Sequence, residues 1–408
     1  MKASAYDGRQ RLRSIGAAVG DAGGILTERI QETHHAIAGR SFAAVGPLAL
    51  PVRVVHDAIA RVAYSAVRTG IRATGRAGGA AAAVTPLAAD PRLFGREAGV
   101  VQGAICGIYG DHLERHHPHL TAPMAIRSGG RDVALQAMPL SDAYPQAGPR
   151  LAVFLHGLCE TEHSWGRPAQ DDDTSGTYGD MLRRQLGVSP LFVRYNSGLQ
   201  VLENAARLAD LLDDLVEAWP VEVEELDLIG HSMGGLIIRG ACDVGAAAGA
   251  RWVPLVGHCV YLGTPHHGAP LERGVDRLVA TLRLLPETRV IADLLDVRSA
   301  GIKDLRFGYA GDDGRDLSLL ATARHHAVAA SLRNMGHVIG DLLVPTTSAF
   351  GEARRGARLG LEDGDRRLIG GVTHFDLLDH PVVAQLLLDW LAGPAVMPPP
   401  SPLVSARP

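Results

Sequence analysis

The chain of 408 residues has little cysteine, almost no lysine and few aromatic residues. The first two shortages argue against particular kinds of site and partner. Its four cysteines form no CxxC pair, which argues against a zinc knuckle and against a redox motif. Lysine occurs only at Lys2 and Lys303, and the formal net charge is −4. Nothing in this balance of charge favours nucleic acid as a partner.

Long apolar runs are missing as well. No run reaches the roughly 18 residues that a membrane-spanning helix needs, and the opening "MKASAYDGRQRLRSIG" lacks the apolar region of a secretory signal. We therefore expect a cytoplasmic location. Hydrophobic residues make up 46% of the chain, an ordinary globular share. Cys242 and Cys259 stand in apolar surroundings and are expected to be small core residues.

The first 125 residues carry no catalytic signature. Residues 1–45 are rich in Gly and Ala and are expected to be loosely ordered, and 46–125 are expected to form a mainly helical region. Helices are predicted at 51–72 and 95–115, joined by the linker "GRAGGAAAAVTPLAAD". Helix 51–72 has an apolar stripe with arginines largely off it, so it could pack on a neighbouring domain or touch a membrane surface.

From residue 126 to 394, short β-rich runs alternate with helical ones. This pattern predicts an α/β fold in which helices cover a mostly parallel sheet. Strands are expected at 132–138, 151–157, 191–196, 226–231, 257–265, 325–332 and 367–374. Helices are expected at 201–219, 234–247 and 381–392. An insertion at 269–323 with leucines at helical spacing predicts a helical cap, and the proline-rich tail 395–408 is expected to be disordered.

The motif "GHSMG" places Ser232 between Gly230 and Gly234, where a predicted strand becomes a predicted helix. A serine hydroxyl is a poor nucleophile near neutral pH and needs an adjacent base. Two glycines would allow the tight, strained turn of a nucleophile elbow, which lifts the hydroxyl above the sheet. The plain alternative is an ordinary turn whose serine caps the helix.

A base and an acid follow in the order that an elbow of this kind requires. Asp341 comes after the predicted strand 325–332, and His374 comes after the last strand. The order Ser232, Asp341, His374 is that of α/β-hydrolase triads. The rival acids, Asp376 and Asp379, and the rival base, His380, stand close to His374 in sequence. His380 begins the final helix and is expected to be its cap.

Several motifs together resemble one family. They are "HGLCETEHSW", "GHSMGGL", "YLGTPHHGAPLE", "RSAGIKDLRFG", "GDLLVPTTSA" and "THFDLLDHP". Over roughly residues 96–392 the chain resembles the bacterial lipase-like α/β-hydrolases, and it is also similar to the catalytic domain of GPI inositol-deacylases of the PGAP-one type. The resemblance implies an α/β-hydrolase fold and an ester hydrolase with Ser232, Asp341 and His374 as its triad.

The same resemblance assigns the surrounding backbone. The N–H groups of Leu158, after the "HG" dipeptide, and of Met233, after the serine, would form the oxyanion hole. Gly230, His231 and Gly234 would build the elbow. We expect a small-molecule ester or lipid substrate, and neither metal nor cofactor.

Other interpretations stay open at this point. An acyltransferase could use the same triad, and a non-catalytic scaffold or peripheral membrane protein could be built around helix 51–72. His112 and His116 have the spacing of a metal-ligand pair but equally that of a polar helix end. His266 and His267 are expected to position other groups or to contact the cap.

Overall fold

The computed structural model describes most of the chain. The described residues are 50–82, 96–118, 121–166, 176–268, 299–305, 318–332, 341, 343–352 and 358–393, with isolated positions before residue 32. The chain divides into two compact units. One combines Met1–Gln102, Ile108–Ala122 and Leu271–Ser299, and the other combines Gly103–Gly107, Pro123–Pro270 and Ala300–Pro408.

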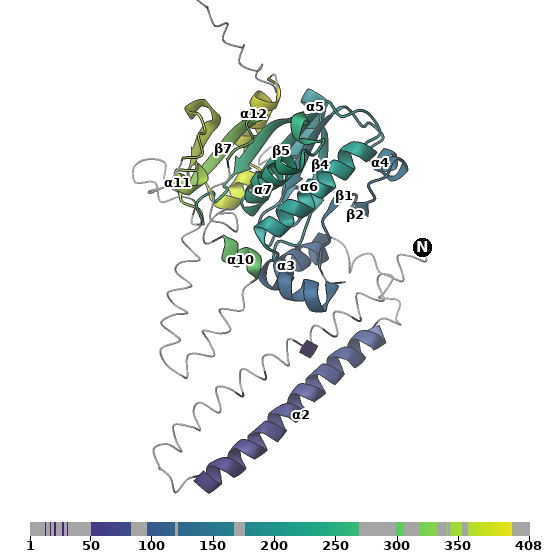
Figure 1. Cartoon of the computed structure of the whole chain (residues 1–408), viewed down its shortest axis with the longest axis vertical. Coiled ribbons are helices and arrows are strands. Elements are labelled where there is room, and N and C mark those ends of the chain that lie inside the picture. The colour runs from purple at the N-terminus through teal and green to yellow at the C-terminus, as the bar shows by residue number, and fades with distance from the viewer. Residues whose placement is uncertain are drawn as a thin grey trace, which may run out of the picture. The chain divides into compact units, whose positions relative to one another are not determined.

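An eight-stranded sheet forms the centre of the second unit (Figure 1). In the order β2-β1-β4-β3-β5-β6-β7-β8, all pairs from β4 to β8 are parallel, and β1 runs antiparallel to β2 and β4. The strands are β1 (Ala125–Ser128), β2 (Arg131–Val133), β3 (Arg150–Leu155), β4 (Ser189–Arg194), β5 (Glu225–His231), β6 (Val256–Leu262), β7 (Arg324–Ser331) and β8 (Arg366–Gly370). With helices flanking this mostly parallel sheet, the unit has the α/β-hydrolase fold.

Two helical layers bury the sheet. Helices α6 (Val201–Ala218) and α7 (Met233–Ala248) contribute to one apolar cluster, together with Leu226 and Leu228 of β5. Helices α5 (Tyr178–Leu186) and α12 (Pro381–Leu391) contribute to a second cluster with Ile229 of the same strand. Because successive side chains of a strand point to opposite faces, the central strands are apolar on both sides, as a covered parallel sheet requires.

The remaining elements are short or belong to the N-terminal region. The short elements are α4 (Ala137–Ala143), η5 (Glu162–Gly166), η6 (Val253–Leu255), α10 (Ala300–Asp304), α11 (Thr346–Ala349), η7 (Asp363–Asp365) and η8 (His374–Leu378). The N-terminal region contributes α2 (Leu50–Ala82) and α3 (Arg96–His116). Within the described ranges, none of the helices has the length and apolarity to cross a membrane.

Most predicted elements are confirmed to within a few residues, including the six strands from 151–157 onward and the three helices at 201–219, 234–247 and 381–392. The predicted strand 132–138 is wrong, because β2 ends at Val133 and α4 begins at Ala137. Pro139 explains the difference, since proline fits the first turn of a helix but removes a donor from a sheet. Sequence reasoning missed β1 and α5 altogether.

Helix α2 corrects a second expectation, because it continues to Ala82 and takes in the first half of the expected linker. Alanine is the best helix former, and an alanine run outweighs two neighbouring glycines. The predicted tail 395–408 lies outside the described residues, as do nearly all of 1–45 and most of the cap 269–323. The expected domain boundaries stay predictions.

Strand β5 and helix α7 meet with almost no space between backbones. A Cβ added at Gly230 would lie 2.5 Å from the Gly235 nitrogen, and one at Gly234 would lie 2.5 Å from the Leu155 oxygen. Real Cβ atoms essentially never approach this closely. The glycines of "GHSMGG" are therefore required by the contact between α7 and its flanking strands.

We expect Gly234→Ala to destabilise the fold by about 1–3 kcal/mol, as overpacking in a rigid core does. The measurement is urea unfolding followed by circular dichroism. Gly70→Ala is the matched control, because the space around Gly70 in α2 is open. That variant should be neutral, or stabilising by up to about 1 kcal/mol. Equal effects of the two substitutions would contradict the close-approach argument.

Candidate active site

The carboxyl ends of three strands bring the predicted triad residues to one edge of the sheet. Ser232 follows β5, Asp341 follows β7 and His374 follows β8. His374 Nδ1 lies 2.6 Å from Asp341 Oδ2, and both side chains are about 2% exposed. Residues 33 positions apart in sequence thus form a short, buried histidine–carboxylate pair.

Ser232 and His374 both adjoin the end of β6. The Ser232 N–H donates to the Leu262 oxygen at 2.8 Å. A Cβ added to the next residue, Gly263, would lie 2.8 Å from His374 Cε1. Gly263 also has a φ of 61°, so glycine serves there both to turn the chain and to admit the imidazole ring.

The backbone of Ser232 is strained, with φ 52° and ψ −120°. Among the described residues, Ser232 and Cys159 are the non-glycine residues with positive φ. Such conformations cost about 1–3 kcal/mol and cluster at functional sites. Ser232 precedes α7, but its side chain makes no capping hydrogen bond to the helix. The alternative of an ordinary capping serine is therefore wrong.

Backbone amides hold the Asp341 carboxylate in place. Its Oδ1 accepts hydrogen bonds from the N–H groups of Leu343 at 3.0 Å and Val344 at 2.7 Å. The second oxygen, Oδ2, is the one that faces His374. This division fixes the carboxylate and directs one oxygen at the imidazole.

Two of the rival groups have other roles. Asp376 Oδ2 accepts from the Thr373 N–H at 2.6 Å and from the Thr373 hydroxyl at 2.8 Å, which forms the capping box at the start of η8. His380 Nδ1 accepts from the Val382 N–H at 3.1 Å and caps α12, which confirms that expectation. The third rival, Asp379, is buried.

The loop after β3 lies beside the serine, as a Cβ added at Gly157 would be 3.1 Å from Ser232 Cβ. The amides on both sides of Leu158 have partners. The Gly157 N–H donates to Glu160 Oε2 at 2.8 Å, and the Cys159 N–H donates to Ser197 Oγ at 3.1 Å. Met233 is the first residue of α7, where backbone N–H groups have no partner within the helix.

His156, of the "HG" dipeptide, supports this loop through buried contacts. Its ring is fully buried and stacks on Tyr195, with centroids 4.2 Å apart. The Tyr195 N–H donates to His156 Nε2 at 3.3 Å, so the proton of the neutral ring sits on Nδ1 and points to the Gly157 oxygen at 2.8 Å. Burial lowers the pKa of His156 to about 4, which keeps the ring neutral.

A buried ion pair that sequence reasoning missed links these loops. His231 Nδ1 lies 3.1 Å from the Glu160 carboxylate, and His231 Nε2 lies 3.2 Å from the His374 carbonyl oxygen. Both ring nitrogens face acceptors, which is the pattern of a protonated imidazole. The only sequence signal was an acidic residue three positions after Gly157, in a loop with an otherwise apolar start.

The pKa shifts agree with this charge state. Burial opposes charge on both groups, yet the His231 ring and the Gly157 N–H lower the pKa of Glu160 to about 2. The Glu160 carboxylate likewise raises the pKa of His231 against the effect of burial. The pair is therefore ionised over the range between these two values.

His374 is shifted in the opposite sense. Burial lowers its pKa, and the neighbouring His231 charge lowers it further, while the bond to Asp341 partly offsets both. The ring centroids of His231 and His374 are 4.7 Å apart. His374 is consequently neutral near pH 7 and able to accept a proton.

Two further predicted residues lie near this edge. His266 is buried, with its Nδ1 3.2 Å from Arg239 Nη1 and its ring edge-on to Tyr261. The backbone N–H of His267 donates to Ser348 Oγ at 3.1 Å. Their expected contacts with the cap fall on residues outside the described ranges.

We expect Glu160→Gln to lower the free energy of unfolding by about 1.5–3 kcal/mol near pH 5.5, since it removes a charged hydrogen-bond acceptor from a buried site. The folded pKa of Glu160 lies below its ordinary 4.5, so its contribution is present above pH 4.5 and is lost as pH falls toward 2. The folded pKa of His231 lies above its ordinary 6.5, so its contribution is present below pH 6.5 and is lost as pH rises through the raised value.

The difference between wild type and Glu160→Gln should therefore be greatest between pH 4.5 and 6.5. Urea unfolding at a series of pH values measures it. Glu224→Gln, at an exposed carboxylate, is the control and should show no such window. A difference that is flat across pH would mean that the pair is not ionised in the folded chain.

No family model and no curated protein matches the chain, so the resemblance to GPI inositol-deacylases stays a prediction. Among solved structures, the chain is similar to the mature lipase BlEst2 of Bacillus licheniformis, with 19% identity and a TM-score of 0.39, over 60% of this chain and 92% of that one. It is similar to a thermophilic esterase from Thermogutta terrifontis, with 14% identity and a TM-score of 0.36, over 60% and 90%. It is also similar to an esterase of Pyrococcus furiosus, with 13% identity and a TM-score of 0.36, over 61% and 84%.

Proposed function

We propose that the chain is a serine ester hydrolase of the lipase or carboxylesterase type. The observation that carries the proposal is the 2.6 Å contact between His374 and Asp341 at the same sheet edge as Ser232, a serine held at a φ of 52°. A strained serine, a neutral histidine and a fixed carboxylate are the components of nucleophilic acyl transfer.

In the proposed reaction, Ser232 attacks the acyl carbonyl while His374 Nε2 takes its proton. Asp341 keeps the other nitrogen, Nδ1, protonated and stabilises the imidazolium that forms, without becoming protonated itself. The imidazolium then gives its proton to the leaving alcohol, and an acyl-enzyme remains on Ser232. Water attacks this ester with His374 again acting as the base, which regenerates the serine.

The Leu158 and Met233 N–H groups are proposed to bind the oxyanion. Support comes from the loop geometry, in which the amides flanking Leu158 are already engaged and Gly157 lies beside Ser232. The N-terminus of α7 adds its positive dipole end at the same place. Losing one donor from such a site typically costs about 2.7–4 kcal/mol of transition-state stabilisation.

The ion pair of Glu160 and His231 is proposed to position both halves of this machinery. Glu160 holds the Gly157 amide, and His231 holds the His374 carbonyl. The pair therefore connects the oxyanion loop to the loop of the catalytic histidine through the residue that precedes the nucleophile.

An acyltransferase with the same residues is the second candidate, since it differs only in whether water or another acceptor attacks the acyl-enzyme. A series of p-nitrophenyl esters of rising chain length, with and without an added alcohol, separates the two and locates the preferred acyl length. A steady-state rate of p-nitrophenol release that rises with added alcohol, with an ester of that alcohol as the product, would favour transfer.

Ser232→Ala should abolish labelling by a fluorophosphonate probe and lower kcat by around 10⁶-fold, the usual loss when a serine nucleophile is removed. Ser141→Ala, at an exposed serine of α4, is the control and should label like wild type. Substantial turnover by a pure, folded Ser232→Ala sample would overturn the assignment.

Asp341→Asn should lower kcat by about 10⁴-fold, because the amide can hold His374 in the wrong tautomer. Asp376→Asn tests the rival acid and should affect the start of η8 far more than turnover. If Asp376→Asn were the more damaging change to kcat, Asp341 would not be the acid of the triad.

Activity should fall on the acid side with a midpoint below pH 6.5. The base must be neutral to act, and the pKa of His374 is lowered from its ordinary 6.5. A pH profile of kcat/KM on a soluble ester measures the midpoint. A midpoint above 6.5 would show that the Asp341 bond outweighs burial and the His231 charge.

A further inference from the structure

A second group of chemistry-bearing side chains lies at the amino ends of the central strands, at the other end of β5 from Ser232. Glu225 and Asp227 stand on β5, and His258 stands on β6. One ligand atom from each residue lies within 4.8 Å of the other two. Among the residues that the structure describes, no other group of three or more histidine, cysteine, aspartate or glutamate side chains brings its ligand atoms this close together.

A β-bulge brings the three residues together. Leu226 pairs with Val256, but Leu228 pairs with Cys259, so β6 carries one extra residue at this point. The extra residue sets His258 opposite Asp227, where regular pairing would have turned one of them away. Bulges recur where a strand must re-aim a side chain, including at functional sites.

Two of the three residues carry buried polar atoms without a hydrogen bond. Asp227 is 0% exposed, and both of its carboxylate oxygens lack a hydrogen bond. His258 is also 0% exposed, and its Nε2 lacks a hydrogen bond. Buried polar atoms in native proteins are nearly always satisfied by protein, water or an ion, and leaving a carboxyl unpaired costs several kcal/mol in general.

The other nitrogen of His258 is fixed by a chain of contacts. His258 Nδ1 lies 3.0 Å from His326 Nε2, and His326 Nδ1 lies 2.9 Å from Asp365 Oδ1. The contact with His326 engages Nδ1 of His258 and leaves Nε2, which has no hydrogen bond, as the ring nitrogen open to an ion.

In metal-binding histidines the second ring nitrogen commonly contacts an outer group that sets the orientation of the ring, and His326 occupies that place beside His258. The His326 ring is itself held between aromatic rings. It stacks on His258 with centroids 5.3 Å apart and on Trp390 with centroids 4.4 Å apart. A rigid outer layer of this kind favours one fixed direction for the His258 lone pair.

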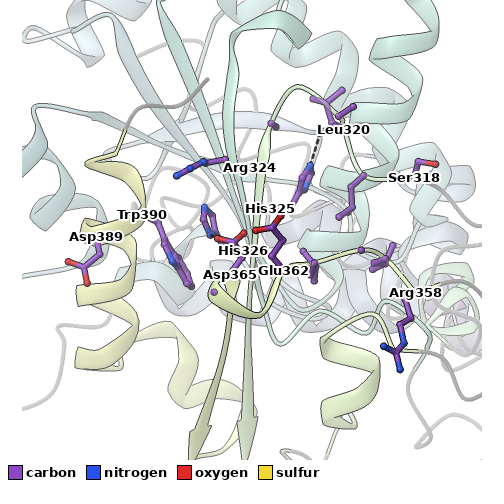
Figure 2. Close-up of a pocket in the computed structure, with 17 residues that line it drawn as sticks. Ser318, Leu320, Arg324, His325, His326, Arg358, Glu362, Asp365, Asp389 and Trp390 are labelled. Atoms are coloured by element: carbon purple, nitrogen blue, oxygen red, sulfur yellow. Dashed lines mark hydrogen bonds and ion pairs between the residues drawn. The ribbon is translucent and has the colours of Figure 1, made fainter. Parts of the chain in front are cut away.

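A pocket of about 660 Å³ opens onto this outer layer. Figure 2 shows His326, Asp365 and Trp390 among its lining residues, with Arg324 and His325 at the start of β7. Solvent reaches the Asp365 carboxylate here, as its side chain is 32% exposed. The pocket thus lies at the amino ends of β7 and β8, away from the strand ends that carry the candidate triad.

We propose that Glu225, Asp227 and His258 bind one divalent transition-metal ion of the zinc type. One imidazole nitrogen and two carboxylate oxygens are a ligand set that Zn²⁺ accepts, with water as a fourth ligand. Arg150 Nη2 donates to Glu225 Oε1 at 2.9 Å and to the Leu391 oxygen at 2.7 Å, which orients Glu225 and offsets part of the negative charge. The ion joins β5 to β6 and takes no part in the proposed ester cleavage.

The test uses the full chain, freed of metal with a chelator and titrated with Zn²⁺ in a calorimeter. Wild type should bind one equivalent of Zn²⁺ more than Asp227→Asn or Glu225→Gln. Comparing stoichiometries in this way subtracts zinc that surface histidines bind in all three chains. Saturating Zn²⁺ should also raise the Tm of wild type by about 5 °C, and leave the Tm of the two variants unchanged. Glu224→Gln is the matched control, since it removes the neighbouring exposed carboxylate from the same strand end and should behave as wild type.

Equal zinc stoichiometry and equal Tm responses in wild type, Asp227→Asn and Glu225→Gln would overturn the proposal. So would an Asp227→Asn chain that is more stable than wild type with zinc present, because Asp227 would then be a neutral buried acid. Glu225→Gln lies at a half-buried position and remains informative if Asp227→Asn fails to fold. None of these readouts depends on ester turnover.

Discussion

The contact between strand β5 and helix α7 is the constraint on which the rest of the candidate site depends. With glycine at 230 and 234, the backbones approach so closely that no side chain fits between them, and Gly235 leaves room for the Thr264 side chain. This approach forces Ser232 into a conformation that other residues avoid, and it sets the N-terminus of α7 beside the nucleophile. The glycines are therefore the structural cause of the elbow, and the strain of the serine is its consequence.

The buried pair of Glu160 and His231 extends that constraint to the two loops on either side. One partner binds the loop after β3 and the other binds the loop after β8. Removing a charged pair from water costs free energy, and such a pair is tolerated when its remaining donors and acceptors are hydrogen-bonded. Here the Gly157 N–H and the His374 carbonyl supply these hydrogen bonds. The pair is therefore stable only while the loops of Gly157 and His374 keep the positions that the proposed reaction needs.

The sequence carried enough information to predict the sheet, most helices and the serine–aspartate–histidine order. Those features leave local signals, such as apolar strands, glycines and residues that follow strands. Glu160 left almost no signal, because its role depends on a partner 71 positions away. Asp227 and His258 were missed for a related reason. A β-bulge brings them together, and no local sequence pattern predicts that bulge. Pro139 and the alanine run after residue 72 misled the local reading, because helix propensity there outweighs the apparent strand and linker patterns.

The two proposed centres stand at opposite ends of one strand. Asp227 and Ser232 are five residues apart on β5 and its end, which is about 16 Å in an extended chain. Most side chains at both ends are buried, and apolar clusters cover the strand between them on both faces. Such a strand is a stiff spacer. A metal ion that joins β5 to β6 at the Asp227 end would therefore also help to fix the position of Ser232.

The strained serine has a consequence for how the chain loses its native state. Its conformation persists only while the backbone hydrogen bonds to Leu262 and Gly235 hold it, because a free serine would relax to an ordinary backbone angle. A slight loosening between α7 and the sheet would release that strain while the strands stay paired. Covalent reactivity of the hydroxyl would then disappear at denaturant concentrations that leave the circular dichroism unchanged, making the serine an early reporter of failing tertiary packing.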